Sequence, residues 1–328
     1  MRNLFICLSP AQILYSVEVI NKIQLKTDQC DLFYYDYKES PITQYYLKKN
    51  KNFFNKINFF LINKNFPFYV FEIRKFFKNQ IYNQIFLCNT EGIIEYYILS
   101  FCSFKNLNTF YEGSSNIFKI NENLLIKDKI FKIFKDLIYF IFGNRYSKRK
   151  ILSIYKNHYT ISKNDLNKTN KNIKIKNPFS NFKNKYLKNK PKKKISVVVG
   201  TCIQDFSKTN KDLLKYFLFR TEKFILKLIN SEKIGEQTLF YPHPRSVKYY
   251  FKSKKIKIVN SKLIIEDFIK KKIFSGYKVK IYCSVLSSLF YSIPHLKYNF
   301  YYYKKYYYNK DVIYRSKKKF PNTPHLEL

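Results

Sequence analysis

The sequence predicts two α/β domains, each built on a parallel sheet with helices on both faces. Three observations lead to this fold class. Short apolar runs of strand length alternate with longer helical runs, and the alternation occurs in both halves of the 328 residues. Between the halves the composition shifts to Lys and Asn with few apolar residues, as in a linker between domains. We therefore expect an N-terminal domain over 1–161, a linker over 162–194 and a C-terminal domain over 195–328.

Two helices of the first half are expected to begin with a Ser-Pro pair, Ser9–Pro10 and Ser40–Pro41. The Ser oxygen can cap the first turn, and Pro already has the φ angle of the first helical position. Each pair follows an apolar run that is typical of a buried strand, and two further runs flank a Phe-rich helical stretch. The strands are expected at 3–8, 32–35, 57–62 and 84–88, and the Phe-rich helix at 68–77.

The second half repeats this alternation. Strands are expected at 195–199, 238–241, 256–259 and 278–282, and a helix with an apolar face at 217–229. Two doubly wound, Rossmann-like domains that are joined by one linker have a cleft between their strand ends. This arrangement is the glycosyltransferase B (GT-B) architecture. Ligands of such sheets bind at the carboxyl ends of the strands, so the residues that follow each strand are the candidates for a site.

A Phe- and Ile-rich segment, 130–142, precedes Arg145, Lys148, Arg149 and Lys150. One interpretation is an amphipathic helix that lies on a membrane and has a basic flank. The other is a core helix of the first domain with a solvated end. The sequence favours the core helix.

The charge is strongly basic, with 62 Lys and Arg against 22 Asp and Glu and a formal net charge of +40. Such an excess points to nucleic acid or to an anionic membrane. The excess is mainly Lys and accompanies abundant Asn, Ile, Tyr and Phe over the whole length, which is the pattern of AT-rich codons. No zinc-ligand spacing, basic zipper or RNA-binding sheet signature is present. We therefore expect no nucleic-acid partner, while an anionic membrane surface remains a candidate.

The cysteines and the first residues bear on the cellular compartment. The six cysteines form no CxxC pair and lie mostly in apolar runs, as buried thiols of a reducing compartment do. The apolar start is interrupted by Pro10, Gln12 and Glu18 and has no cleavage site of small residues, so it does not read as a signal peptide. No apolar run approaches the roughly 18 residues of a spanning helix. We therefore expect a cytoplasmic protein, and we expect any contact with the inner membrane to be peripheral.

The clearest candidate for chemistry is Tyr-Pro-His-Pro-Arg at 241–245, directly after an expected strand. Proline fixes φ and removes a backbone donor, so the two prolines hold the backbone of His243 in place. His243 can give or take a proton near pH 7, and Arg245 carries the planar fork that suits a phosphate. The alternative is an exposed loop histidine between two turn prolines.

A second candidate is Glu112–Gly113, at the end of a β-prone run. Glu112 can act as a general base, and Gly113 allows the close approach of a ligand. Taken alone, an ordinary Glu-Gly turn is the favoured interpretation.

Several motifs are absent from the sequence. It contains no GxGxxG, no GxxxxGK and no Asp-x-Asp. A dinucleotide fingerprint, a P-loop and a metal-dependent nucleotide-sugar transferase of the A type are therefore disfavoured. A phosphate would instead meet hydroxyls, backbone amides, Arg and His.

Four motifs together resemble glycosyltransferase family 52, the bacterial lipooligosaccharide sialyltransferases. They are the opening Asn-Leu-Phe-Ile-Cys-Leu-Ser-Pro-Ala-Gln at 3–12, Glu112–Gly113, Pro-His-Pro at 242–244 and Ser287–Ser288. Each is short, but their order and spacing are moderately specific, and the resemblance covers most of the chain.

The resemblance implies a donor, CMP-sialic acid, that binds the C-terminal domain and reacts without a metal or other cofactor, with inversion by direct displacement. His243 would meet the departing phosphate as an acid or electrostatic partner, and the hydroxyls of Ser287 and Ser288 would bind the same phosphate, at a helix start where backbone amides favour an anion. Glu266 would hold the ribose hydroxyls. The expected donor-binding residues are Pro244, Arg245, Glu266, Ser287, Ser288 and Gly113.

The resemblance also implies a base in the N-terminal, acceptor-binding domain. Glu112 would take the proton of the acceptor. The sequence departs from the family pattern here, because Tyr111 stands where a second acid is often found. Asp205, after the Gly200 strand, is the alternative base.

The implied acceptor is a terminal sugar, galactose, of a lipooligosaccharide or another surface glycan. A related transferase that uses another nonulosonic acid or a nucleotide hexose is the nearest alternative. A non-catalytic basic protein that binds membrane or nucleic acid is an alternative of another class, and an inactive paralogue is a further one. Exposed Phe and Tyr are compatible with a homodimer.

Overall fold

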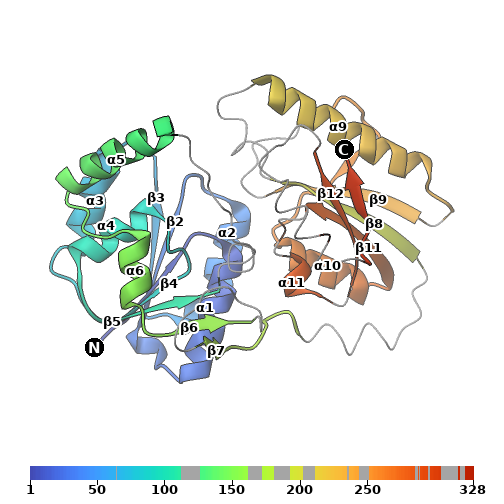
Figure 1. Cartoon of the computed structure of the whole chain (residues 1–328). Helices are drawn as coiled ribbons and strands as arrows, with labels where there is room; N and C mark the ends of the chain where they lie inside the picture. Colours follow the sequence, from blue (N-terminus) through green and yellow to red (C-terminus); the bar gives the residue numbers. More distant parts are fainter. Residues whose placement is uncertain are drawn as a thin grey trace. The chain divides into compact units, whose positions relative to one another are not determined.

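The computed structural model describes thirteen ranges of the chain and divides it into two compact units, Met1–Pro178 and Phe179–Leu328 (Figure 1). The described residues are 1–63, 65–111, 126–161, 172–180, 193–201, 211–234, 236–243, 251–284, 287, 289–294, 296–303, 317 and 322–328. The division falls inside the range 162–194 that the composition marks as a linker.

The first unit contains a parallel sheet of seven strands in the order β3-β2-β1-β4-β5-β6-β7. Its strands are β1 Asn3–Cys7, β2 Cys30–Asp36, β3 Lys56–Leu61, β4 Ile81–Leu87, β5 Ser103–Phe110, β6 His158–Thr160 and β7 Asn172–Lys174. Its helices are α1 Pro10–Ile23, α2 Pro41–Lys49, α3 Phe68–Phe77, α4 Ile93–Phe101, α5 Ile126–Ile141 and α6 Lys148–Ile154, with short 3-10 turns at Thr27–Gln29 and Lys51–Phe53. From β1 the chain adds β2 and β3 on one side, and it then crosses back to add β4 on the other side of β1. The order in which strands are added to the sheet therefore reverses between β1 and β4.

Helices cover both faces of this sheet, α1 and α2 on one face and α3 and α4 on the other (Figure 1). β1 is buried along its whole length, since its side chains alternate between the two faces and both are covered. Phe5 stacks on Phe86 with ring centroids 4.4 Å apart, while Leu4 and Ile6 belong to the cluster under α3 and α4. A central strand therefore reads as a continuous apolar run.

The second unit contains a parallel sheet of six strands in the order β10-β9-β8-β11-β12-β13. Its elements are β8 Lys193–Val199, α9 Lys211–Asn230, β9 Glu236–Tyr241, β10 Lys257–Ile258, α10 Ile265–Phe274, β11 Tyr277–Ser284, α11 Leu289–Ser292, β12 Lys297–Tyr302 and β13 His325–Glu327. α9 lies on one face of the sheet, and α10 and α11 lie on the other (Figure 1). The order repeats that of the first sheet, and the reversal falls between β8 and β11. The expected fold class of two doubly wound α/β domains is confirmed.

Both expected Ser-Pro helix starts are confirmed. Ser9 Oγ accepts a hydrogen bond from Gln12 N at 3.4 Å, and Gln12 Oε1 accepts one from Ser9 N at 3.1 Å, which completes a capping box. Ser40 Oγ accepts a hydrogen bond from Ile42 N at 3.2 Å. Local sequence therefore fixes where α1 and α2 begin.

One short strand lies within the range expected as a linker. β7 pairs in parallel with β6 through Tyr159 and Ile173, at the edge of the first sheet. An edge strand is held by backbone hydrogen bonds and exposes polar side chains, so a Lys- and Asn-rich sequence is compatible with it. For this reason the composition alone does not indicate β7.

The expectation that 130–142 is a core helix is wrong for most of its described side chains. Ile133, Leu137 and Phe140 are 68%, 54% and 66% exposed, and only the opposite side of α5 turns inward, where Tyr139 packs against the core. The periodicity of a helix shows that it has an apolar face but not which way that face points.

The cysteines of the described residues are free thiols. Cys7, Cys30, Cys88 and Cys283 are buried, and Cys102 is half-buried. For these five, the expectation of scattered thiols, mostly buried, is confirmed. The sixth, Cys202, lies outside the described residues.

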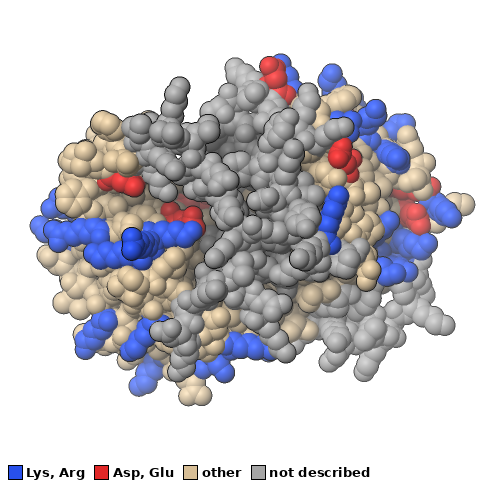
Figure 2. All heavy atoms as spheres, in the orientation of Figure 1, with Lys and Arg blue, Asp and Glu red and all other residues tan. Residues whose placement is uncertain are grey.

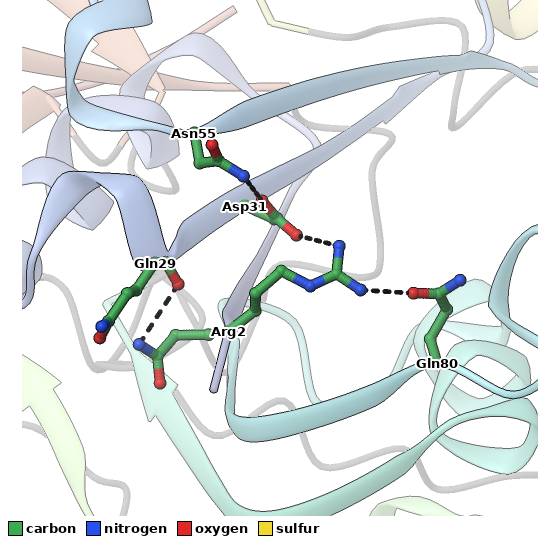
Figure 3. A network of polar contacts seen from close by, with 6 residues as sticks. Arg2, Gln29, Asp31, Asn55 and Gln80 are labelled. Carbon is green, nitrogen blue, oxygen red and sulfur yellow. Dashed lines mark hydrogen bonds and ion pairs between the residues drawn. The ribbon is translucent and has the colours of Figure 1, made fainter.

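A polar network joins elements at the amino ends of the first sheet (Figure 3). Arg2 donates to Asp31 Oδ2 at 3.1 Å and to Gln80 Oε1 at 2.6 Å, and Asn55 Nδ2 donates to Asp31 Oδ1 at 3.3 Å. Asp31 is almost fully buried and is thus paired on both carboxylate oxygens. The network ties β1, β2 and the start of β4 together at the edge opposite to the one where ligands of such sheets bind.

Candidate active site

The candidate residues of the second unit lie at the carboxyl edge of its sheet. His243 follows β9 and Ser287 follows β11, on either side of the central strand β8, which leads into Gly200. The register pairs Val199 with Tyr241, so the ends of β8 and β9 are level. Because β8 and β11 enclose the point where the chain direction reverses, this edge is where a doubly wound sheet binds ligands.

Tyr241 fixes the chain directly before the Pro-His-Pro turn. Its carbonyl accepts a hydrogen bond from Gly200 N at 2.8 Å, and its hydroxyl donates to the carbonyl of Leu263. The ring lies against Phe268 with centroids 5.3 Å apart, and burial raises the pKa of the Tyr241 hydroxyl. His243 is half-buried two residues later. The position of His243 thus depends on a tyrosine that sequence reasoning treated as the end of a strand.

Ser287 links the end of β11 to the start of α11. Its amide donates to Ser284 O at 2.9 Å, and its Oγ accepts from Leu289 N at 3.3 Å. Its hydroxyl also bonds the thiol of Cys283, whose pKa is raised by burial and lowered to a smaller degree by this bond. The location at a helix start is as expected, although α11 has only four residues. The contact of Ser287 with a phosphate stays a prediction.

Glu266 lies in the first turn of α10 and is 5% exposed. Burial raises the pKa of its carboxyl to about 7, with a smaller raising effect of Asp267, while a hydrogen bond with Ser292 acts in the opposite direction. Burial raises the pKa values of Tyr241 and Tyr298, and the carboxylate of Glu266 adds a smaller rise to each. Glu266 therefore sits between α10, α11 and the sheet. Its expected contact with a ribose stays a prediction.

Six candidate residues lie outside the described residues. They are Glu112, Gly113, Asp205, Pro244, Arg245 and Ser288. The chain directly before Glu112 is described: Tyr111 is fully buried, its amide donates to Tyr159 O at 2.8 Å, and its ring meets that of Tyr15 edge-on at 5.1 Å. The end of β5 is thus fixed up to the residue that precedes the expected base.

The carboxyl edge of the first sheet holds a buried carboxyl that the sequence analysis missed. Glu95, in the first turn of α4, is fully buried and accepts a hydrogen bond from Tyr35 Oη at 2.7 Å. Burial raises the pKa of Cys7, and the carboxylate of Glu95 adds a smaller rise. Tyr35 and Glu95 thus lie together at the ends of β1, β2 and β4, where the strand order of the first sheet reverses. Gly92, one of six glycines, was the available signal, since it follows a strand end and precedes an apolar helical run.

In the described parts of the chain, His, Cys, Asp and Glu side chains form no group of three or more that is able to hold a metal ion. Within the same ranges, no helix has both the length and the apolar character of a membrane span. Metal independence stays a prediction.

The chain is similar to curated bacterial sialyltransferases. It is 29% identical over 225 residues to N-acetyllactosaminide alpha-2,3-sialyltransferase of Haemophilus influenzae, covering 66% of this chain and 64% of that protein. It is 26% identical over 174 residues to CMP-N-acetylneuraminate:beta-galactoside alpha-2,3-sialyltransferase of Pasteurella multocida, covering 49% and 52%. The matched part spans less than two thirds of the length of either relative.

Solved structures with a similar fold include an S. aureus MnaA complex with UDP, with a TM-score of 0.53 and 8% identity over 98% of this chain and 88% of that one. A sialyltransferase from Photobacterium damsela has a TM-score of 0.50 and 12% identity over 100% and 81%. At these identities the likeness concerns the fold alone, and it agrees with the GT-B type expected from the sequence.

The resemblance drawn from the four motifs is tested by the family comparison. The model of glycosyltransferase family 52 matches residues 18–304, which is most of the chain. The chain therefore belongs to glycosyltransferase family 52.

Proposed function

We propose that the protein is an inverting, metal-independent sialyltransferase that moves sialic acid from CMP-sialic acid to a terminal galactose of a lipooligosaccharide or another surface glycan. The observation that carries the proposal is the placement of His243 and Ser287 at the carboxyl ends of β9 and β11, on both sides of β8. Membership of family 52 and two relatives named as alpha-2,3-sialyltransferases support the donor and the reaction.

The proposed chemistry requires one group that stabilises the departing phosphate and one that removes the acceptor proton. His243 protonates or electrostatically stabilises the phosphate as the bond to the sugar breaks, and the hydroxyl of Ser287 donates to the same group. The tyrosine anchored before the turn keeps the imidazole in position, which limits the reorganisation needed in the transition state. Glu112, or Asp205 in its place, takes the proton of the acceptor hydroxyl.

The test is CMP release from CMP-sialic acid, with and without a galactose-terminated acceptor, in the presence of EDTA. We expect acceptor-dependent release that EDTA does not change. His243→Ala should lower kcat by about 100-fold to 1000-fold, because a general acid or a phosphate-stabilising donor is lost. His325→Ala is the matched control, since His325 begins the edge strand β13, and it should leave kcat unchanged.

Three outcomes contradict the proposal. If there is no turnover and CMP does not shift the thermal midpoint, the CMP donor is wrong, and other nucleotide sugars are to be tested next. If His243→Ala keeps full activity, the site is wrong. Binding of CMP without turnover of CMP-sialic acid points to another CMP-linked nonulosonic acid.

A further inference from the structure

The end of β8, the central strand of the second sheet, is held by hydrogen bonds from both sides. On the side of β9, the amide of Gly200 donates to Tyr241 O at 2.8 Å. On the other side, Tyr301 of β12 reaches across β11, and its Oη donates to Val199 O at 2.6 Å. The ladder between β8 and β11 ends one residue before Val199, so a side chain takes the place of a strand partner.

Tyr303, directly after β12, supplies a third contact. Its hydroxyl bonds that of Thr201, the residue that follows Gly200, and lies 2.7 Å from Thr221 Oγ1 of α9. The ring of Tyr303 is buried against that of Phe217, with centroids 4.4 Å apart. Burial raises the pKa of Tyr303 to about 12, while its bonds with other hydroxyls act in the opposite direction to a smaller degree. The hydroxyl is therefore protonated at neutral pH and can donate one hydrogen bond.

The direction of these bonds follows from the single proton of each hydroxyl. Thr221 Oγ1 donates to Phe217 O at 2.8 Å, so it accepts from Tyr303 Oη. The oxygen of Tyr303 is then left to accept from Thr201 Oγ1. We call this series of bonds, from Thr201 through Tyr303 and Thr221 to Phe217 O, the hydroxyl chain. It connects the end of β8 with β12 and α9.

Helix α9 brings Thr221 to the sheet from its inner side. Phe217, Thr221 and Ile225 recur every four residues and are buried, so they share one side of the helix. Exposed residues such as Lys215 and Lys223 lie on the outer side. Figure 2 shows charged side chains in blue and red where Figure 1 shows α9. The hydroxyl chain therefore lies between the helix and the sheet, where little water competes for its bonds.

The hydroxyls of Tyr301 and Tyr303 are not required to fill the core. Two other members of the same cluster, Phe217 and Phe240, fill buried positions with a ring alone. Tyr→Phe at position 301 or 303 would keep the ring and avoid the cost of burying a polar group. Both hydroxyls instead bond residues at the end of β8, which indicates that they determine the conformation of the chain there.

We propose that Tyr303 is a positioning residue of the donor site, and that the hydroxyl chain and Tyr301 hold Val199–Thr201 in the conformation that binds the CMP part of the donor. The three contacts fall on consecutive residues at the edge where ligands of a doubly wound sheet bind, beside the strands that lead to His243 and Ser287. A shift of about 1 Å in a binding group is enough to lower a rate by about 100-fold. The inference rests on the proposed function and deepens it, because it names residues on which donor binding depends without contact with the donor.

The experiment measures CMP binding to the full chain by titration calorimetry, together with the donor and acceptor KM values of CMP release. Tyr303→Phe and Thr221→Val each break the hydroxyl chain and keep the shape of the side chain. We expect each to weaken CMP binding and raise the donor KM by about fivefold to tenfold, with the acceptor KM unchanged. Thr221→Ser keeps the hydroxyl and should bind CMP like the wild type. The matched control is Tyr34→Phe, because Tyr34 Oη lies 3.3 Å from Thr43 Oγ1 in a buried pair of the first unit, and it should leave CMP binding unchanged.

Three results would overturn the inference and leave the proposed function intact. Tyr303→Phe and Thr221→Val would bind CMP as tightly as the wild type, or Thr221→Ser would bind it as weakly as Thr221→Val, or Tyr34→Phe would weaken binding to the same degree. The last result would assign the effect to a general loss of stability. Thermal midpoints without ligand show whether each variant is folded, and Thr221→Val decides the question if Tyr303→Phe does not fold. A wild type that does not bind CMP would contradict the proposed function itself, and the inference with it.

Discussion

Position 92 has no space for a side chain, because the carboxyl of Glu95 occupies the place that a Cβ would take. A Cβ added to Gly92 would lie 1.8 Å from Glu95 Oε2 and 2.8 Å from Asn89 Nδ2. The φ angle of Gly92 is −80°, which any residue can adopt, so the requirement is for space and not for backbone freedom. The glycine thus allows Glu95 to fold back toward Tyr35 and hold the strand ends together.

Gly92→Ala should lower the free energy of unfolding by about 1–3 kcal/mol, since either the backbone or the buried carboxyl must move. Urea denaturation followed by circular dichroism measures this value. The control is the same substitution in a Glu95→Ala background, where most of the space is free and the cost of Gly92→Ala should be smaller. Equal costs in the two backgrounds would show that the carboxyl is not the cause.

At the scale of the element, Glu266 couples α10 to α11 through Ser292, and its protonation should therefore affect the second unit. Its pKa in the folded protein, about 7, lies above that of an unfolded Glu. The folded state then binds more protons between these two values, and the free energy of unfolding contributed by this group falls as the pH rises through that window.

Glu266→Gln removes this titration and keeps a side chain that can bond Ser292. We expect the stability of the variant relative to the wild type to rise between about pH 4.5 and about pH 7, by up to about 3 kcal/mol, and to stay level above this window. Thermal midpoints of both proteins across this range measure the difference. Glu232→Gln, at an exposed position, should show the same pH dependence of the thermal midpoint as the wild type. If Glu266→Gln also shows the pH dependence of the wild type, burial does not raise the pKa of the Glu266 carboxyl.

Elements could be predicted where their signals are local. The Ser-Pro starts of α1 and α2 and the central strands were found because caps and continuous apolar runs are properties of neighbouring residues. The short strands β6, β7 and β13 were missed, because three residues held by backbone hydrogen bonds carry no periodic pattern. The outward face of α5 was misread, because orientation depends on what the rest of the chain offers as a partner.

The residues of the candidate site also fall into those that the sequence could predict and those that it could not. His243 and Ser287 could be proposed from the sequence, because unusual turn residues mark the positions after strands. The buried pair of Tyr35 and Glu95 could not, because β2 and α4 bring them together only in the folded sheet. The anchor of the Tyr241 hydroxyl on Leu263 depends on the same kind of distant contact.

At the scale of the whole molecule, the two sheets share one strand order, so each unit has a reversal point at the carboxyl edge of its central strands. In the first unit, Tyr35 and Glu95 form their hydrogen bond at this point, and β5 ends shortly before Glu112 in the sequence. In the second unit, His243 and Ser287 follow the strands that end beside this point. The amino edge of the first sheet instead holds the Arg2 and Asp31 network, which serves stability (Figure 3). The proposed site of the first unit therefore lies at the edge opposite to this network.

A charge of +40 acts on the molecule as a whole. Like charges repel more strongly in the compact state than in the unfolded chain, and salt screens this repulsion over a Debye length of about 10 Å at about 0.1 M. We expect the thermal midpoint to rise by several degrees when sodium chloride increases from about 0.02 M to about 0.2 M.

The rise should be smaller in a variant with Lys254, Lys255 and Lys257 changed to Gln, all of which are exposed residues of the second unit. Local ion pairs act in the opposite direction, because salt also weakens contacts such as Lys194 with Glu236 at 3.1 Å. Exposed pairs of this kind contribute little, so the net repulsion should dominate. A midpoint that stays constant or falls with salt would show that pairing, and not the excess of cations, governs the electrostatic stability of this fold.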